Sequence, residues 1–426
     1  MTNELIALLD GKEVGRVQRD RLGRLTFLYN DDWRQAADAY PLSLSMPLGA
    51  QRHGHSVIDA FLWGLLPDNE HVLGRWAAKF HVSARIAFAL LSHVGEDCAG
   101  AVQFVTPERL EALRAGTQDK VEWLEEADVA KRLQTLREDH AAWRLPRDTG
   151  QFSLAGAQPK TALLLQNGRW GIPSGRVATT HILKPPTGHF EGHAENEHIC
   201  LKLARDLDLP TAQSTVKRFG DEIAIVVERY DRLQRGNDII RIHQEDMCQA
   251  RGIMPTKKYQ NEGGPGATDI LELLRTNSTD RDADLDSFVG AFGFNWLIGG
   301  TDAHAKNFSI LLGAGSVRLA PLYDIASILP YDDVDFQKLK LAMKVGGEYK
   351  LAQIGLREWE KFAREARLER DALAARLVSM ATALPDHVND ARQRAQAEGL
   401  QQAFVERLAN QLIERATQCR RLLGDA

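Results

Sequence analysis

The segment TDAHAKN, residues 301–307, places a carboxylate, an imidazole, an ammonium and an amide between two apolar runs. Its Asp302 and Asn307 have the spacing of the catalytic Asp and the metal-binding Asn in protein-kinase catalytic loops. In such a loop the Asp orients an acceptor hydroxyl and takes its proton, while the Asn oxygen binds Mg²⁺. Alternatively, Thr301 or Asp302 caps a helix whose polar side chains face solvent. The spacing alone leaves both interpretations open.

A second acid follows the segment at the place where a kinase carries one. Residues 308–312 and 317–319 predict a β-hairpin around a turn at residues 313–315, and the sequence PLYD then ends at Asp324. Mg²⁺ prefers hard oxygen ligands and retains several waters, so a carboxylate, an amide oxygen and phosphates suffice to hold it. We therefore predict Asn307 and Asp324 as metal ligands. The alternative for Asp324 is a turn residue at the end of a strand.

Weaker signals precede the loop in the order that a kinase would place them. FSLAGAQPKT, residues 152–161, carries small residues that would let backbone N–H groups approach phosphate oxygens, unless it is a simple turn. Lys184 ends a predicted strand and could bind phosphates, with an acid from the helix at residues 194–197 as its partner. VERYDR, residues 227–232, stands where a hinge would pair with adenine, although Tyr230 could serve packing alone. The order of these signals favours a kinase more than any single one does.

The elements that must position these residues alternate between β-rich and helical stretches. The first 30 residues predict a β-meander, and residues 70–80 have helical spacing. We expect hairpins at 160–172 and 215–228, a strand at 181–184, and helices within 107–148, at 194–207 and 284–298, and within 358–423. The predicted domains are an N-terminal α/β domain (1–107), a helical connector (108–150), a β-rich part (151–235) and a helical lobe (236–426).

Bulk properties restrict the class of protein. The chain has 426 residues, 26% of them charged, a net charge of −5 and a pI of about 6.2, which gives no global sign of a nucleic-acid or membrane binder. The four cysteines form no CxxC pair, which argues against a zinc site or a disulfide framework. The N-terminus lacks a signal-peptide pattern, and we expect a cytoplasmic protein.

Several stretches together resemble the HipA family of bacterial toxin kinases. These stretches are SLAGAQPKTALL, HILKPP, ENEHICLKLA, VERYDR, RIHQEDMCQA, GGTDAHAKNFSILL and LAPLYDIAS, together with the N-terminal FLWGLLPDNEHVLGRWA. The resemblance covers most of residues 1–340. It implies an α+β, bilobal protein-kinase-like fold with a small α/β N-terminal domain, and an ATP- and Mg²⁺-dependent serine/threonine kinase.

The resemblance also implies a role for each candidate residue. Asp302 would be the catalytic acid/base, and Ser153 falls on the serine that such kinases autophosphorylate, which ejects the phosphate loop and stops activity. His304 would be either a nucleotide contact or a packed ring. The ATP-binding residues that we expect are Ala155, Gly156, Ala157, Gln158, Lys160, Lys184, Glu228, Arg229, Tyr230, His304, Lys306, Asn307, Tyr323 and Asp324.

The family further implies partners. We expect a HipB-like helix-turn-helix antitoxin, operator DNA bound through the antitoxin complex, and a protein substrate for which glutamyl-tRNA synthetase is the family precedent, with no membrane partner. Phosphorylation of that target would stall translation. Two alternatives are a small-molecule or lipid phosphotransferase on the same scaffold and an inactive pseudokinase that acts as a co-repressor. The presence of Asp302, Asn307, Asp324 and Lys184 together argues against the pseudokinase.

Overall fold

The computed structural model describes residues 3–143, 152–186, 191–236, 238–331 and 334–424. The chain divides into two compact units. Unit 1 comprises Met1–Pro185, Lys217–Lys257 and Ser309–Val317, and unit 2 comprises Pro186–Val216, Lys258–Phe308 and Arg318–Ala426. The domain boundaries predicted from the sequence do not correspond to these units, and they stay a prediction.

The N-terminal part of unit 1 is an antiparallel sheet packed with helices. Its strand order is β4-β3-β2-β1-β5, and the predicted β-meander is confirmed by β1, β2 and β3. The strands are β1 (Glu4–Leu9), β2 (Lys12–Arg19), β3 (Leu25–Tyr29), β4 (Arg52–His53) and β5 (Val102–Val105). The helices are α1 (Asp31–Gln35), α2 (His55–Gly64), α3 (Glu70–Phe80), α4 (Ala87–Val94) and α5 (Pro107–Arg114). Apolar residues of the sheet and of α2, α3 and α4 form one core.

A six-stranded sheet carries the predicted β-rich part, in the order β10-β11-β9-β7-β8-β6. Its elements are β6 (Lys120–Leu124), α6 (Glu126–Glu138), β7 (Thr161–Gln166), β8 (Arg169–Ser174), β9 (His181–Lys184), β10 (Ser214–Phe219) and β11 (Glu222–Glu228). Both predicted hairpins and the strand at 181–184 are confirmed. The charged stretch 107–148 was expected to be helical, but it contains β6 as well as α5 and α6, and residues 144–148 lie outside the described residues. β6 forms because it pairs with β8 along its whole length.

Further short strands complete unit 1. They are β12 (Arg232–Arg235), β13 (Asp238–Arg241), β14 (His243–Asp246), β15 (Ser309–Gly313) and β16 (Ser316–Leu319), with α8 (Met247–Ala250) and the 3₁₀ turn η1 (Pro255–Lys257). The hairpin predicted after residue 308 is confirmed as β15 and β16, and β15 pairs with β14. The stretch predicted as a helical lobe (236–426) therefore also contains strands. The boundary between the units falls within β10 and within β16.

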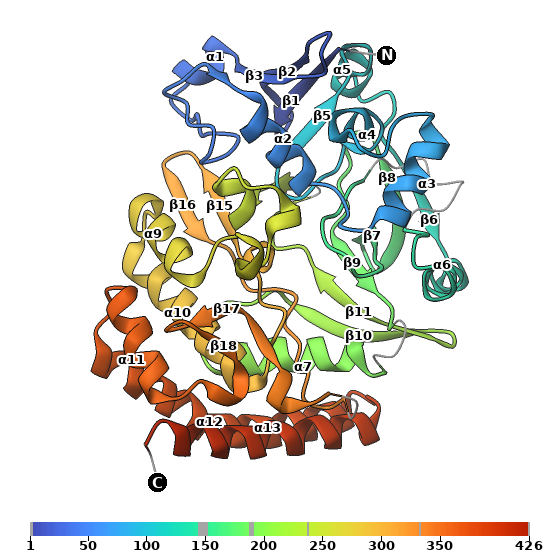
Figure 1. The fold of residues 1–426 in the computed structure, drawn as a ribbon. Coiled ribbons are helices and arrows are strands. Elements are labelled where there is room, and N and C mark those ends of the chain that lie inside the picture. The colour runs from blue at the N-terminus through green and yellow to red at the C-terminus, as the bar shows by residue number, and fades with distance from the viewer. Residues whose placement is uncertain (1–2, 144–151, 187–190, 237, 332–333, 425–426) are drawn as a thin grey trace. The chain divides into compact units, whose positions relative to one another are not determined.

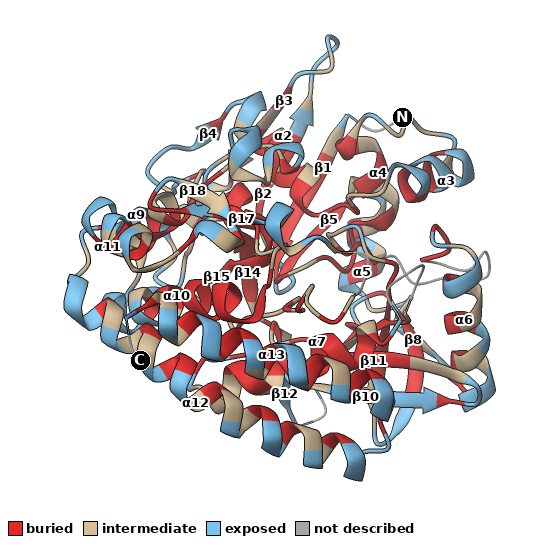
Figure 2. Ribbon diagram, turned by 60° about the horizontal axis from the view of Figure 1, so that its bottom comes forward, coloured by how far each residue is buried: buried red, intermediate tan, exposed pale blue. Residues whose placement is uncertain are grey.

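Unit 2 is mainly helical. Its helices are α7 (His193–Asp206), α9 (Ala267–Asn277), α10 (Arg281–Ile298), α11 (Leu356–Glu365), α12 (Arg370–Ala397) and α13 (Gln402–Leu422). It also contains η2 (Gln260–Glu262), η3 (Ala305–Asn307), η4 (Phe336–Lys338), η5 (Leu351–Gln353) and the hairpin β17 (Lys340–Val345) and β18 (Glu348–Lys350). Figure 1 shows α12 and α13 side by side, and Figure 2 shows buried and exposed residues alternating along both, as amphipathic helices require.

Helix α10 is the centre of unit 2. From Phe288 to Ile298 every residue is buried, so the helix has no polar face over its second half. The ring of Trp359 packs against the rings of Phe292 and Trp296, and the centroid distance is 5.5 Å in both pairs. This rigid support lies immediately before residues 301–307. Among the described residues, every helix is too short or too polar to span a bilayer.

Candidate active site

The TDAHAKN segment begins where α10 stops. Gly299 ends the helix in the left-handed conformation at φ +66°, and the N–H of Gly300 donates to the carbonyl of Asn295 at 2.7 Å. The backbone oxygen of Asp302 then accepts two hydrogen bonds, from the N–H of His304 at 2.7 Å and from Nδ2 of Asn307 at 2.8 Å. Only the three-residue turn η3 follows. The alternative that Thr301 or Asp302 caps an α-helix is therefore wrong.

The carboxylate of Asp302 is held at one oxygen and is exposed. The phenol O–H of Tyr259 donates to Oδ1 of Asp302 at 2.6 Å. Asp302 is exposed, whereas His304, Lys306 and Asn307 of the same segment are buried. A general base must be within hydrogen-bond reach of the proton that it removes. Asp302 is the member of this segment that an external hydroxyl group could reach.

The ring of His304 stands among the charged candidate groups. It is 4% exposed, and its edge meets Tyr259 with ring centroids 5.0 Å apart. Burial lowers the pKa of His304, and although the carboxylates of Asp302 and Asp324 oppose this effect, Lys258 and Lys306 add to it. His304 is therefore a buried, packed ring, and its burial favours the neutral form. The charges of Asp302, Lys306 and Asp324 all act on this ring, so these three side chains lie near it in unit 2.

Asp324 has an unusual backbone. Its φ is +58°, in the left-handed region that few residues other than glycine adopt. Just before it, the O–H of Tyr323 donates to the carbonyl of Lys306 at 2.8 Å, which ties the PLYD segment to the TDAHAKN segment. Asp tolerates this conformation better than most residues, so a turn role is compatible with it. Strained residues concentrate at functional sites, which is compatible with the predicted metal-binding role.

A buried amide holds the residues that follow Asp324. Nδ2 of Asn196, in the first turn of α7, donates to the carbonyl of Ser327 at 2.7 Å, and Oδ1 of Asn196 accepts the N–H of Ser327 at 2.9 Å. Oγ of Ser327 donates to the carbonyl of Ile298 at the end of α10. Asn196 thus joins three segments of unit 2. The sequence analysis did not assign it a role, because nothing in a lone Asn between two Glu residues reveals a partner 131 positions away.

Asn307 and Asp324 in unit 2 carry side-chain oxygen atoms of the kind that bind Mg²⁺. Because Nδ2 of Asn307 donates to the backbone of Asp302, its Oδ1 is the atom that could bind a cation. Together with the Asp324 carboxylate it would supply two hard oxygen ligands. In the part of the chain that the structure describes, no three His, Cys, Asp or Glu side chains gather into a metal site. An ion bound here would therefore need phosphate and water oxygens as well, as Mg²⁺ commonly does.

In unit 1 the predicted phosphate loop is anchored at both ends. The N–H of Ser153 donates to the carbonyl of Asp97 at 2.9 Å, and its hydroxyl donates to the carbonyl of Leu65 at 2.7 Å. Further along, the carbonyl of Gly156 accepts the N–H of Asp68 at 2.9 Å. Ser153 is fully buried, so its hydroxyl is inaccessible in this arrangement. Any phosphorylation of Ser153 requires the loop to open first.

Lys160 supports the loop from within. Its Nζ donates to the carbonyl of Ala155 at 2.8 Å and lies 5.3 Å from the ring centroid of the buried Trp143. Gly156 has φ +99°, and a Cβ on it would lie 2.6 Å from the same ammonium. The positive φ favours glycine at this position, and a side chain here would also have to displace the Lys160 ammonium. Lys160 is only 5% exposed, and its ammonium helps to fix the shape of the loop through the hydrogen bond to Ala155.

The predicted phosphate lysine and hinge lie on neighbouring strands. Lys184 is buried on β9 opposite Ile225 of β11, and Glu228 at the end of β11 is opposite His181. The hydroxyl of Tyr230 donates to Oε1 of Gln244, so its side chain is committed to that contact. The acid expected to pair with Lys184 belongs to unit 2, and that pairing stays a prediction.

Arg229 belongs to a buried charge network that the sequence analysis missed. Its guanidinium donates to Asp231 at 2.8 Å, to the hydroxyl of Thr179 and to the carbonyl of Cys98. Arg232 donates to Oδ1 of Asp97 at 2.8 Å. Burial alone would raise the pKa of Asp97, but Arg232, Arg229 and Arg241 outweigh it and lower that pKa. Because the Arg229 side chain is used in this way, only its backbone remains for the predicted nucleotide contact.

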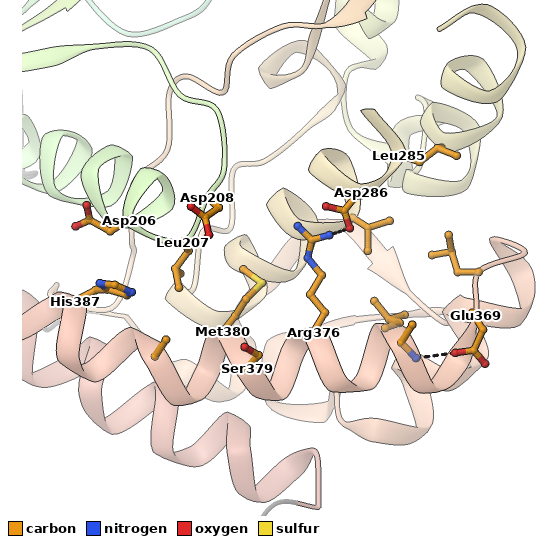
Figure 3. A pocket seen from close by; sticks show the side chains of 15 residues that line it. Asp206, Leu207, Asp208, Leu285, Asp286, Glu369, Arg376, Ser379, Met380 and His387 are labelled. Carbon is orange, nitrogen blue, oxygen red and sulfur yellow. Dashed lines mark hydrogen bonds and ion pairs between the residues drawn. The ribbon is translucent and has the colours of Figure 1, made fainter. Parts of the chain in front are cut away.

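A surface pocket of about 710 Å³ lies elsewhere in unit 2 (Figure 3). It is lined by the end of α7, by α10 and by α12, and includes none of the candidate residues. Four of the charged residues that line it are engaged: Arg376 pairs with Asp286, Asp206 pairs with Arg394, and Glu369 accepts the N–H of Ala372 at the start of α12. The pocket therefore reads as a groove between packed helices.

Comparisons with known proteins match both parts of the chain. Residues 5–105 match the HipA N-terminal domain, and residues 152–388 match the HipA-like C-terminal domain. The chain belongs to the HipA family. The serine/threonine-protein kinase toxin HipA of Shewanella oneidensis is 30% identical over 93% of this chain and 90% of its own length. The candidate kinase Y4mE of Sinorhizobium fredii is 38% identical over 84% of each chain.

A solved structure agrees with this assignment. The HipA of Shewanella oneidensis, in its complex with HipB and operator DNA, is similar with a TM-score of 0.84 and 26% identity, over 99% of this chain and 98% of that one. The predicted fold class is thereby confirmed: this HipA-family chain has an α+β, bilobal kinase-like fold with a small α/β N-terminal domain. Its relatives include proteins named as kinases.

Proposed function

We propose that this protein is a serine/threonine protein kinase toxin of a type II toxin–antitoxin system, using ATP and Mg²⁺. The observation that carries the proposal is the exposed Asp302 carboxylate, with Asn307 and Asp324 in the same compact unit. In the transfer step, an acceptor hydroxyl oxygen bonds to the γ-phosphorus and its proton passes to Asp302. The bond from that phosphorus to the β,γ-bridging oxygen breaks, and ADP leaves with the electron pair.

The remaining candidate residues would bind the nucleotide. Residues 155–160 and Lys184 would hold phosphates, and the backbone of residues 228–230 would pair with adenine. Asn307 and Asp324 would hold Mg²⁺, which neutralises phosphate charge as it builds up during transfer. His304, Lys306 and Tyr323 would shape the wall around the phosphates. Phosphoryl transfer needs positioning and charge neutralisation more than covalent participation, and this set of residues could supply both.

Self-modification at Ser153 would switch the kinase off. The buried Ser153 holds the start of the phosphate loop through its bonds to Asp97 and Leu65. A phosphoserine carries about −1.5 to −2 charge at pH 7, which this dry position could not accommodate. The modified loop would stay open and lose its phosphate contacts.

The proposed partners follow the relatives. The similar Shewanella structure contains HipB and operator DNA, so we propose a HipB-like antitoxin that inhibits this kinase and brings it to operator DNA. The proposed target is a protein hydroxyl, with glutamyl-tRNA synthetase as the first one to test.

The test compares wild-type protein with Asp302→Asn in a cell lysate supplied with Mg-ATP. Loss of a general base typically costs about 10²- to 10⁴-fold in rate, so the variant should transfer almost no phosphate to protein while still binding ATP. Asp386→Asn, an exposed change on α12, should behave as wild type. Phosphopeptide mapping would identify the target and report Ser153. Transfer to metabolites alone would favour the small-molecule phosphotransferase, and ATP binding without any transfer would favour the pseudokinase.

A further inference from the structure

We propose that Tyr259 is a positioning residue for Asp302 in phosphoryl transfer, an inference that rests on the function proposed above. The phenol O–H of Tyr259 donates to Oδ1 of Asp302 at 2.6 Å. Asp302 lies in an exposed turn, where a short side chain would otherwise exchange among rotamers. A hydrogen bond to an ionised carboxylate is among the stronger ones in proteins. The phenol therefore selects one orientation of the carboxylate.

Tyr259 can do this because its own backbone is fixed. Its carbonyl accepts the N–H groups of Glu262 and Gly264, each at 3.0 Å. The neighbouring carbonyl of Lys258 accepts the N–H of Ala305 at 3.2 Å, which ties this turn directly to the segment that carries Asp302. The turn and the catalytic segment are thus joined by backbone as well as side chain.

The ring of Tyr259 is fixed as well. It packs in a T-shaped arrangement against the buried ring of His304, with an interplanar angle of 82°. The ammonium of Lys258 lies 5.5 Å from the Tyr259 ring centroid. These contacts orient the ring, while the hydroxyl alone contacts Asp302. Replacing Tyr259 by Phe would remove the hydroxyl contact with Asp302 and keep the packing of the ring.

The arrangement divides the labour between the two carboxylate oxygens. Oδ1 of Asp302 is bonded to Tyr259, and Oδ2 is left as the oxygen for an acceptor hydroxyl. A carboxylate held in this way meets the acceptor without first losing rotational freedom, which is the usual advantage of a pre-oriented group. The role assigned to Tyr259 is to raise the rate of the bound complex and not the affinity for substrate.

The experiment measures steady-state kinetics of Tyr259→Phe with the protein acceptor identified in the lysate assay. We expect kcat to fall about 10- to 150-fold, the range for one hydrogen bond to a charged group, with acceptor KM, ATP affinity and the thermal unfolding midpoint unchanged. Tyr349→Phe on β18 is the matched control and should leave all four values unchanged. Tyr259→Ala should lower kcat further and reduce the unfolding midpoint, because it also removes the ring from His304.

The outcomes separate this inference from the proposed function. If wild-type protein transfers no phosphate, the function and the role of Tyr259 both fall. If wild-type protein is active and Tyr259→Phe matches it, only the role of Tyr259 falls. A faster Phe variant would show that Tyr259 competes with the acceptor, and phosphate found on Tyr259 would show that it is itself an acceptor. Either result overturns the positioning role.

Discussion

At the scale of single residues, Asp324 carries two demands that a substitution can separate. Its carboxylate is the proposed metal ligand, and its backbone has φ +58°. Asn tolerates the left-handed conformation, whereas Ala is strained there by roughly 1 kcal/mol. The two changes therefore test the charge and the backbone in turn.

We expect Asp324→Asn and Asp324→Ala both to weaken the Mg²⁺ dependence of ATP binding, since each removes the negative charge. Only Asp324→Ala should also lower the free energy of unfolding, by about 1 kcal/mol relative to Asp324→Asn. Nucleotide titrations with and without Mg²⁺, alongside urea unfolding, measure the two effects. An unchanged magnesium dependence would reduce Asp324 to a turn residue.

Glu245 on β14 is a buried acid outside the proposed chemistry. One of its oxygens accepts the N–H of Leu44 at 2.8 Å, while Oε2 has no hydrogen-bond partner among the described residues. Burial raises the pKa of Glu245 from 4.5 to about 8, against the opposing bonds from Leu44 and Ser43. The folded protein thus keeps a proton that the unfolded chain releases, and stability falls as the pH rises from 4.5 to about 8.

Glu245→Gln should remove this part of the pH dependence because the amide never ionises. Its unfolding free energy should match wild type near the lower end of that range and exceed it at the upper end by an amount on the order of a few kcal/mol. Urea unfolding at both ends of the range measures the difference. Glu122→Gln, an exposed change on β6, is the control, and an equal response of the two variants would contradict the assignment.

At the scale of elements, the loop before β7 depends on one glycine. Gly156 has φ +99°, and a Cβ there would lie 2.6 Å from Nζ of Lys160, which already donates to Ala155. Gly156→Ala must therefore displace Lys160 or the loop. In contrast, Gly168 between β7 and β8 has φ +76° and open space around a Cβ.

We expect Gly156→Ala to weaken ATP binding about tenfold or more, and Gly168→Ala to change it less than about twofold. Both glycines have a positive φ, so both variants carry backbone strain, and only Gly156→Ala also meets the Lys160 ammonium. Isothermal titration with ATP measures the affinities. Similar losses in the two variants would mean that strain alone, and not the packing of the loop, controls binding.

Elements with a strong local pattern could be predicted, and those defined by distant partners could not. The helix at 70–80 and the strand at 181–184 coincide with α3 and β9 because their apolar spacing is regular. β6 was missed because its charged residues are organised by β8, far along the chain. The β17–β18 hairpin does carry a local signal, because Gly346-Gly347 is a typical two-residue hairpin turn, but the sequence analysis did not predict this hairpin. In the candidate site, the TDAHAKN segment was found from spacing, whereas Tyr259 and Asn196 act through contacts that no local pattern contains.

At the scale of the whole molecule, chain order and compactness do not coincide. The segment with β15 returns to unit 1 to pair with β14, while the segments on either side of it belong to unit 2. Each unit is therefore assembled from three pieces of chain, and a truncation at any predicted domain boundary would leave unit 1 incomplete. Expression of residues 151–426 alone, for example, would lack the β6 that covers the edge of β8.

The network around Asp97 has a consequence for how such chains evolve. Asp97 lies in the part that matches the HipA N-terminal domain, whereas Arg229, Arg232 and Arg241 lie in the part that matches the C-terminal domain. A buried arginine that loses its acid costs several kcal/mol. The N-terminal and C-terminal parts therefore cannot be exchanged independently between relatives. Recombination between relatives that brought in an N-terminal part without this acid would remove one of the two acids that balance these buried arginines, so we expect the two parts to be inherited together.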